Sequence, residues 1–248
     1  MGKILQSVRS ISVVTEKNIR IYYSKPPVII FGLLFPFFMF LAFLLGRQVD
    51  LYNFFPGFIA MSLFFTSSSV GPLITPWEKT AGTYERLLSF PVTISTMILG
   101  DTIAGMIFGI GLNAILVTVG IFALGYSVNI LILILGIIVS AFVFSCLGVF
   151  LASPSSKNPS NIMMLSSIIR FPLIFISGIF IPLEQLPLAG RILSYFSPIT
   201  YLVDIFNYSL KGTHNINLGI DFLALIAFAA VFLIFANIFH KKNLLKGL

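Results

Sequence analysis

Apolar segments of about twenty residues, with few or no charges, recur along the chain and are separated by shorter polar stretches. At 1.5 Å per residue, an apolar helix of about 20 residues crosses the hydrocarbon core of a bilayer, which is about 30 Å thick. The pattern predicts six transmembrane helices, at Val28–Gly46, Phe54–Thr75, Thr102–Gly125, Val128–Ala152, Asn161–Ile181 and Gly219–Phe239. We expect the second to be kinked or broken near Pro56 and Pro72, because proline removes a helical hydrogen bond. The predicted fold class is an all-α membrane protein.

Two segments outside these spans carry helical patterns of their own. In residues 1–25, apolar side chains recur at helical spacing on one face, while Lys3, Lys17 and Arg20 are turned away from it. This pattern predicts an N-terminal amphipathic interfacial helix. The stretch 182–217, between spans five and six, is amphipathic and interrupted by prolines. It therefore predicts re-entrant or interfacial helices rather than a simple span or a solvated loop.

Composition agrees with a membrane assignment. Of 248 residues, 58% are hydrophobic and 9% are charged, whereas about a quarter of the residues of a soluble domain are charged. Six spans use up the length of the chain, so residues 1–248 are expected to form a single transmembrane domain. The one cysteine, Cys146, lies within an apolar run, which excludes a disulfide framework within the chain.

The net charge of +7 is distributed unevenly over the predicted topology. With both termini in the cytoplasm, the inner side collects Lys3, Arg9, Lys17, Arg20, Lys25, Lys79, Arg86, Lys157, Lys241, Lys242 and Lys246. The outer side holds only Arg47, Arg191 and Lys211. Because basic residues accumulate on the cytoplasmic side of membrane proteins, the pattern predicts a multi-pass protein of the cell membrane with both termini inside and 182–217 outside. The same bias explains the basic excess without nucleic-acid binding.

The long polar stretch between spans two and three, residues 76–95, is the strongest candidate for contact with a partner. Projecting residues 77–88 on a single helix separates an apolar face from charged ones. The apolar face holds Trp77, Ala81, Tyr84 and Leu88, with Glu78 and Glu85 on one side of it and Lys79 and Arg86 on another. Such a helix would pack its apolar face against the transmembrane helices and expose its charged side chains to a partner protein. An ordinary solvated loop helix fits the periodicity equally well.

Two motifs give the chain a family resemblance. Residues 77–93, WEKTAGTYERLLSFPVT, resemble the inner-loop motif G-T-x-E-R-L-L-x-x-P-V of ABC-2 type transporter permeases. Residues 175–187, FISGIFIPLEQLP, and 197–204, SPITYLVD, are similar to the family's F-x-S-G-x-F-x-P-x-x-x-L-P and its later N-P-L-T-Y. Ser197 stands where asparagine is common. Both motifs occur in the family's order, and the resemblance extends over nearly the whole chain.

The resemblance implies the transmembrane permease subunit of an ATP-binding cassette exporter, similar to those that export drugs, lipo-oligosaccharides or polysaccharides. It implies a dimer with a second copy or a homologous permease, and a separate ATPase subunit docked on the N-terminal helix and on residues 76–95, a cytoplasmic coupling helix loop. The residues implied to couple to the ATPase are Trp77, Glu78, Lys79, Thr83, Tyr84, Glu85, Arg86, Leu87 and Leu88. The expected cargo is hydrophobic or amphipathic: a drug, a lipid or a glycan.

The sequence indicates independently that ATP is bound and hydrolysed by another chain. It contains no G-x-x-x-x-G-K-[ST] run, the glycine-rich loop and lysine that hold nucleotide phosphates. ATP and magnesium are therefore expected on the partner subunit, with no cofactor on this chain. His214 and His240 lie far apart and neither has an acidic cluster beside it, so no metal site or catalytic triad is predicted. The chain is expected to be a transport subunit without catalytic residues.

Arg170 is a charged residue inside the fifth predicted span. It lies nine residues into that span, about 14 Å along the helix axis. Insertion scales assign an arginine at a helix centre about 2.5–3.5 kcal/mol, so its side chain should face a cavity, an acidic partner such as Asp101, or the inner interface. Arg170 is therefore a candidate for contact with an anionic substrate headgroup, and a structural ion pair is the alternative.

Gly105 and Gly109 have the spacing that lets membrane helices approach closely, and Gly111 lies nearby.

Two other classes of function stay open at this point. An ion-gradient-driven secondary transporter would need intramembrane acids or broken helices arranged in related halves, for which Asp101 alone is thin support. A membrane enzyme acting on lipids is disfavoured, because no cluster of His, Asp or Glu gathers at one membrane face. An adjacent gene encoding a phosphate-binding loop would favour the ATP-driven exporter over both.

Overall fold

The computed structural model describes residues 2–46, 50–90, 92–154 and 158–244; the side chains of a few helical residues, among them Glu85 and Leu88, lie outside that description. The described part of the chain is helical and contains no strand. In chain order the helices are α1 Gly2–Tyr22, α2 Pro26–Ile29, the π-helical turn η1 Ile30–Leu34, α3 Phe35–Gly46, α4 Leu51–Ser68, α5 Gly71–Thr80, α6 Thr83–Ser89, α7 Ile94–Leu124, α8 Ile130–Leu151, α9 Pro159–Phe175, the 3-10 turn η2 Leu183–Gln185, α10 Leu188–Ser194, α11 Pro198–Lys211 and α12 Leu218–Leu244. The all-α fold class is confirmed.

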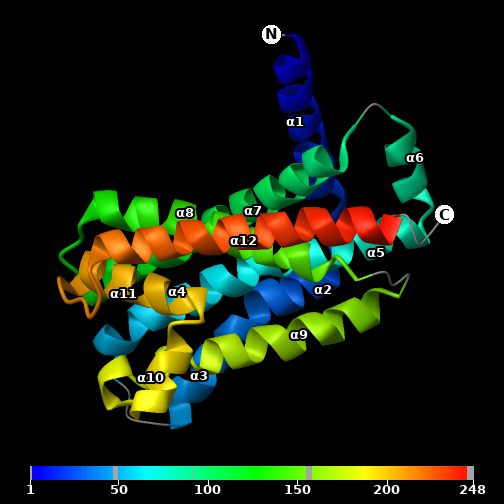
Figure 1. Cartoon of the computed structure of the whole chain (residues 1–248). Coiled ribbons are helices and arrows are strands. Elements are labelled where there is room, and N and C mark those ends of the chain that lie inside the picture. The colour runs from blue at the N-terminus through cyan, green and yellow to red at the C-terminus, as the bar shows by residue number, and fades with distance from the viewer. Residues whose placement is uncertain (1, 47–49, 91, 155–157, 245–248) are drawn as a thin grey trace.

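The long helices lie side by side in a bundle, and α1 projects away from it (Figure 1). Helix α6 lies at one end of the bundle, and α10 and α11 lie at the other (Figure 1). The axis of residues Gln6–Tyr22 makes an angle of 92° with that of Pro26–Met39. A helix perpendicular to the first predicted span is what an interfacial helix requires, because such a helix lies in the plane of the membrane surface.

Four of the six predicted spans are helices long and apolar enough to cross a membrane: Leu51–Thr80, Ile94–Leu124, Ile130–Leu151 and Leu218–Asn243. The first predicted span passes the same criteria only together with α1, as the bent pair described above. The fifth corresponds to α9, an apolar helix of 17 residues. Six complete spans are therefore not established by length and composition alone.

Helix α4 lies at the centre of the bundle. From Phe55 to Ser68 every side chain except that of Ser62 is buried. The ring of Phe64 meets that of Phe144 edge-on with centroids 5.0 Å apart, a favourable arrangement of aromatic quadrupoles. Because α4 is covered on all sides, a displacement of this helix must displace its neighbours.

The two prolines of the second span act differently. Pro56 lies inside α4 without ending it; the carbonyl of Tyr52, which proline leaves without its helical donor, accepts a hydrogen bond from the Tyr126 hydroxyl. The helix instead ends at Ser68, and α5 begins at Gly71, with Pro72 in its first turn. The predicted break near Pro72 is confirmed.

Close contacts at glycine hold α4 against its neighbours. A Cβ atom at Gly105 would lie 2.9 Å from the Ser67 carbonyl oxygen, and one at Gly109 would lie 3.0 Å from the Ser67 Cβ. At Gly111 an added Cβ would meet no atom within 4 Å. The predicted close approach at Gly105 and Gly109 is confirmed, and it brings α7 onto the centre of the bundle.

Candidate functional site

Residues 77–88 do not form the single helix that their periodicity predicts. Helix α5 ends at Thr80, Gly82 adopts a left-handed conformation with φ 66°, and α6 begins at Thr83. Glycine tolerates this conformation because it has no Cβ atom, and it commonly terminates helices for that reason. The predicted common apolar face of residues 77–88 is therefore wrong. Trp77, Glu78 and Lys79 lie at the end of α5, and the remaining predicted coupling residues lie on α6.

Glu78 faces the interior rather than a partner. Its side chain is 3% exposed and forms an ion pair with the Lys17 ammonium of α1. The Tyr22 hydroxyl lies 3.5 Å from the same carboxylate oxygen. A buried carboxylate needs such partners, because loss of hydration would otherwise disfavour its charge. The prediction that Glu78 and Glu85 share a charged outer side does not hold for Glu78.

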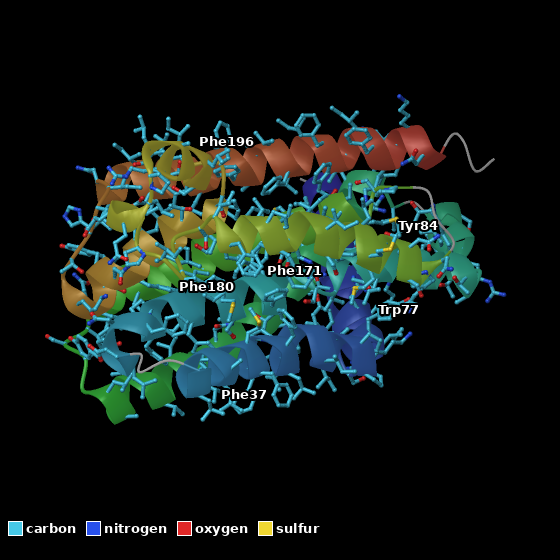
Figure 2. The ribbon with its side chains drawn as sticks, turned by 90° about the horizontal axis from the view of Figure 1, so that it is seen from below. Phe37, Trp77, Tyr84, Phe171, Phe180 and Phe196 are labelled. Atoms are coloured by element: carbon cyan, nitrogen blue, oxygen red, sulfur yellow. The ribbon has the colours of Figure 1, made fainter. Side chains whose placement is uncertain are left out.

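Trp77 joins the same junction through its ring. The rings of Trp77 and Tyr22 are stacked with centroids 5.6 Å apart. The Lys25 ammonium lies 4.3 Å from the Trp77 ring centroid and 4.9 Å from that of Tyr22, so one cation contacts both aromatic faces. Figure 2 shows Trp77 and Tyr84 at the same end of the molecule. We call the group formed by Lys17, Tyr22, Lys25, Trp77 and Glu78 the α1–α5 junction.

A second set of contacts ties α1 to α7. The Asn18 side-chain amide donates to Asp101 at 2.5 Å, and the Thr15 hydroxyl donates to the Gly100 carbonyl at 3.1 Å. Asn18 is fully buried. Since α1 is bonded to both α5 and α7, it cannot slide along either helix without breaking hydrogen bonds.

Helix α6 packs on the bundle through Tyr84, while Arg86 on the same helix is exposed. The Tyr84 side chain is buried, and the Lys79 ammonium lies 5.4 Å from its ring centroid. Burial, and secondarily the carboxylates of Asp101 and Glu78, raises the pKa of Tyr84 to about 12, so its phenol is neutral at physiological pH. Arg86 and Thr83 are exposed and Leu87 is half-buried. Glu85 and Leu88 have side chains outside the described part of the structure.

Sequence reasoning missed Lys17, Asn18, Tyr22 and Asp101 as members of this site. It assigned Lys17 to the polar face of α1, whereas its ammonium reaches back to Glu78. One signal was present in the sequence. Thr15 and Asn18 are polar residues on the mainly apolar face of the N-terminal helix, and a polar residue on such a face often has a specific hydrogen-bond partner.

Arg170 lies apart from this surface, at the break between α4 and α5. It is 1% exposed, and its guanidinium donates to the Ser69 hydroxyl at 3.2 Å and to the Ser166 carbonyl at 3.4 Å. The Phe65 ring centroid lies 5.7 Å from the guanidinium carbon. Among the described side chains no carboxylate forms a salt bridge with Arg170. The suggested pairing with Asp101 is wrong, because Asp101 is bonded to Asn18.

The position of Arg170 explains how its charge is tolerated. Ser69 directly follows the last residue of α4, where the helix dipole places partial negative charge on free carbonyls. The aromatic face of Phe65 adds a further favourable surface for a cation.

Residues 9–211 match the sequence profile of the family described as ABC-2 type transporter. The Inner membrane transport permease YadH of Escherichia coli strain K12 is 26% identical over 215 residues, which cover 84% of this chain and 82% of YadH. The protein of the same name in Shigella flexneri is similar to the same extent. The Probable multidrug ABC transporter permease YbhS of Escherichia coli strain K12 is 28% identical over 181 residues, which cover 72% of this chain and 48% of YbhS.

Proposed function

We propose, from the premise that this chain belongs to the ABC-2 type transporter family, that it is the transmembrane permease subunit of an ATP-driven exporter. It is a multi-pass plasma-membrane protein, and its relatives are named transport permeases. In this proposal a separate subunit binds ATP and magnesium. This chain converts the movement of that subunit into a rearrangement of its own transmembrane helices. The proposed cargo is hydrophobic or amphipathic: a drug, a lipid or a glycan.

One observation carries this proposal: the α1–α5 junction continues directly into the most buried helix. Helix α5, which ends with Trp77, Glu78, Lys79 and Thr80, follows α4 after a break of two residues, and together they form the apolar segment Leu51–Thr80, most of which is buried. A partner that pushes on the exposed residues of α6 would move α5, and through it the enclosed α4. Conformational work of this kind needs no catalytic residue on this chain.

The proposal also includes topology and assembly. Helix α9 would be the fifth span, since its 17 residues are at the lower limit of about 17–25 residues for spanning helices and it runs along the bundle in Figure 1. With α2–α3 as the first span, the chain would cross six times, with both termini and α6 in the cytoplasm and residues 182–217 outside. The basic residues collected on the α6 side support this orientation. We propose that two copies, or this chain and a homologous permease, form the working unit.

The charge-swapped variant Glu85→Lys with Arg86→Glu tests the coupling role of α6. We expect the co-purified ATPase to keep hydrolysing ATP in reconstituted vesicles while transport per ATP falls about tenfold, because a reversed charge pattern costs a docking surface a few kcal/mol. The conservative variant Glu85→Asp with Arg86→Lys is the matched control and should keep its coupling. Unchanged coupling in the charge-swapped protein would reject the assignment of α6.

We further propose that Arg170 contributes to the substrate path, because it is a buried cation whose described partners are neutral. Arg170→Met keeps much of the side-chain volume and removes the charge, so we expect an intact fold and a loss of transport for anionic cargo, with neutral cargo unaffected. Arg170→Lys should retain part of the anion transport. Undiminished transport of every tested anion by Arg170→Met would remove this residue from the path.

A further inference from the structure

A polar cavity of about 250 Å³ lies at the end of the bundle opposite α6. It opens to the surface and is lined by the first turns of α4, the segment 178–184, one face of α11 and the start of the loop between α11 and α12. Its lining side chains are mostly polar: Asn53, Glu184, Thr200, Asp204, Asn207, Lys211, Thr213, His214 and Asn215, with Phe54, Ile179, Pro182, Leu183 and Val203 as the apolar part of the wall. Nothing in the coupling role of α6 accounts for this cavity.

The polar wall is built by the spacing of residues in α11. Thr200, Asp204, Asn207 and Lys211 recur at intervals of four, three and four, so they lie on one face of the helix. A polar helical face usually lies in water. Here half of it is covered, since Thr200 is 1% and Asp204 is 2% exposed, while Asn207 and Lys211 are half-buried. Polar residues that line a cavity in this way indicate a binding surface rather than an ordinary hydrated helix face.

Asp204 holds the loop between α11 and α12, which forms one wall of the cavity, in a fixed position. Its two carboxylate oxygens accept hydrogen bonds from the backbone N–H groups of Asn215 and Ile216, at 2.8 and 2.9 Å. These charge-assisted bonds fix the loop that carries Thr213 and His214. The cavity therefore has a defined shape before any ligand arrives, which reduces the entropy lost on binding.

The charges around the cavity disfavour an ionic ligand of either sign. The Lys211 ammonium lies 3.5 Å from the Asn53 side-chain oxygen, and burial lowers the pKa of Lys211. The attraction of Asp204 and Glu184 for a cation is opposed by Lys211, and the attraction of Lys211 for an anion is opposed by the two carboxylates, so the charges offset one another for a ligand of either sign. What the cavity offers instead is a mixture of neutral donors and acceptors from the three asparagine side chains, Thr213 and His214.

We propose that this cavity binds a neutral, hydroxyl-rich group the size of one sugar ring. Hydroxyl groups both donate and accept, so they match asparagine amides, which do the same. The apolar wall around Phe54 and Leu183 can pack against the C–H face of such a ring. A volume of 250 Å³ is just below the range of about 300–1,000 Å³ typical of sites for drug-sized ligands, which favours a single small group. The proposal does not depend on ATP-driven transport.

Ligand-observed NMR on the full-length protein in lipid nanodiscs, without ATP, tests the proposal with four separate probes: D-glucose, N-acetylglucosamine, inorganic phosphate and choline. We expect saturable binding of at least one sugar and none of the two ions. Asn207→Leu should weaken that binding about tenfold, the effect of one lost hydrogen bond between ligand and cavity. Asn161→Leu, an exposed asparagine on α9, is the matched control and should bind as the unmodified protein does.

Thr213→Val, an almost isosteric change in an exposed loop, is the second variant in case Asn207→Leu fails to fold. Loss of sugar binding in either folded variant supports the site. Phosphate or choline binding that depends on these residues would overturn the assignment to a neutral ligand. Absence of sugar binding, or sugar binding unaffected in both variants, would overturn the site itself. Because the binding experiment contains no ATP, its outcome does not bear on the exporter proposal, which the charge-swapped variant of α6 tests separately.

Discussion

Glu78→Ala is expected to destabilise the folded protein by about 3–5 kcal/mol, since removing one member of a buried ion pair leaves the other charge without compensation. Lys17 would lose its carboxylate partner while its side chain stays 23% exposed, so the value should fall toward the lower end of that range. The same change also removes the acceptor beside the Tyr22 hydroxyl. The fraction of folded protein during titration with SDS, followed by circular dichroism, gives the difference in unfolding free energy.

Helix α1 supplies the control for this experiment. Glu16 and Arg20 form a surface ion pair at 2.7 Å with side chains 61% and 77% exposed, so Glu16→Ala should cost less than about 1 kcal/mol. The double variant Lys17→Met with Glu78→Leu should recover most of the lost stability, because it leaves no unpaired charge in the interior. Equal costs for Glu16→Ala and Glu78→Ala would show that the α1–α5 junction is not held by the Lys17–Glu78 pair.

Gly105→Ala is expected to destabilise the protein by about 1–3 kcal/mol, because the added methyl group overpacks the contact between α7 and α4. The new Cβ would lie 2.6 Å from the Ser145 hydroxyl oxygen and 2.9 Å from the Ser67 carbonyl oxygen. The second of these atoms belongs to the backbone, so a change of rotamer cannot relieve the clash and the helices must move apart. Thermal unfolding in detergent, compared between variants at one protein concentration, measures the effect.

Gly111→Ala is the matched control for Gly105→Ala, in the same helix and with the same chemical change. No atom lies within 4 Å of a Cβ placed at Gly111. Both variants gain the same preference of alanine over glycine for the helix, so the difference between them isolates the clash. A Gly105→Ala protein as stable as Gly111→Ala would mean that α4 and α7 are not in the close contact described above.

Hydropathy alone was enough to predict a helical membrane protein and its apolar segments, although the fifth predicted span ran to Ile181 and α9 ends at Phe175. The physical reason is local: in lipid every backbone polar group must be satisfied within its own segment, so a long apolar run must be a helix. Local signals also predicted the break near Pro72 and the close approach at Gly105, which depend on the residue itself and its spacing. The two motifs indicated the family, and the match of residues 9–211 to the family profile confirms it.

Periodicity failed where a partner decides the role of a side chain. It placed Glu78 on an outer charged side, yet this carboxylate is bonded to Lys17, which is 61 residues away in the sequence. The cost of burying a charge likewise suggested Asp101 as the partner of Arg170, yet Asp101 is hydrogen-bonded to Asn18 and Arg170 to Ser69. A helical projection states which residues share a face, but it contains no information on which helix will cover that face.

The sequence by itself determined the fold class, the apolar segments and the family of this protein, because each follows from local chemistry or from a motif of contiguous residues. Only the tertiary structure decided that α1 is bonded to α5 and α7, that α4 is the enclosed centre, and that the polar stripe of α11 lines a cavity rather than meeting water. These arrangements depend on contacts between residues distant in the chain, whose pairing is fixed when the helices pack together and not when each helix forms.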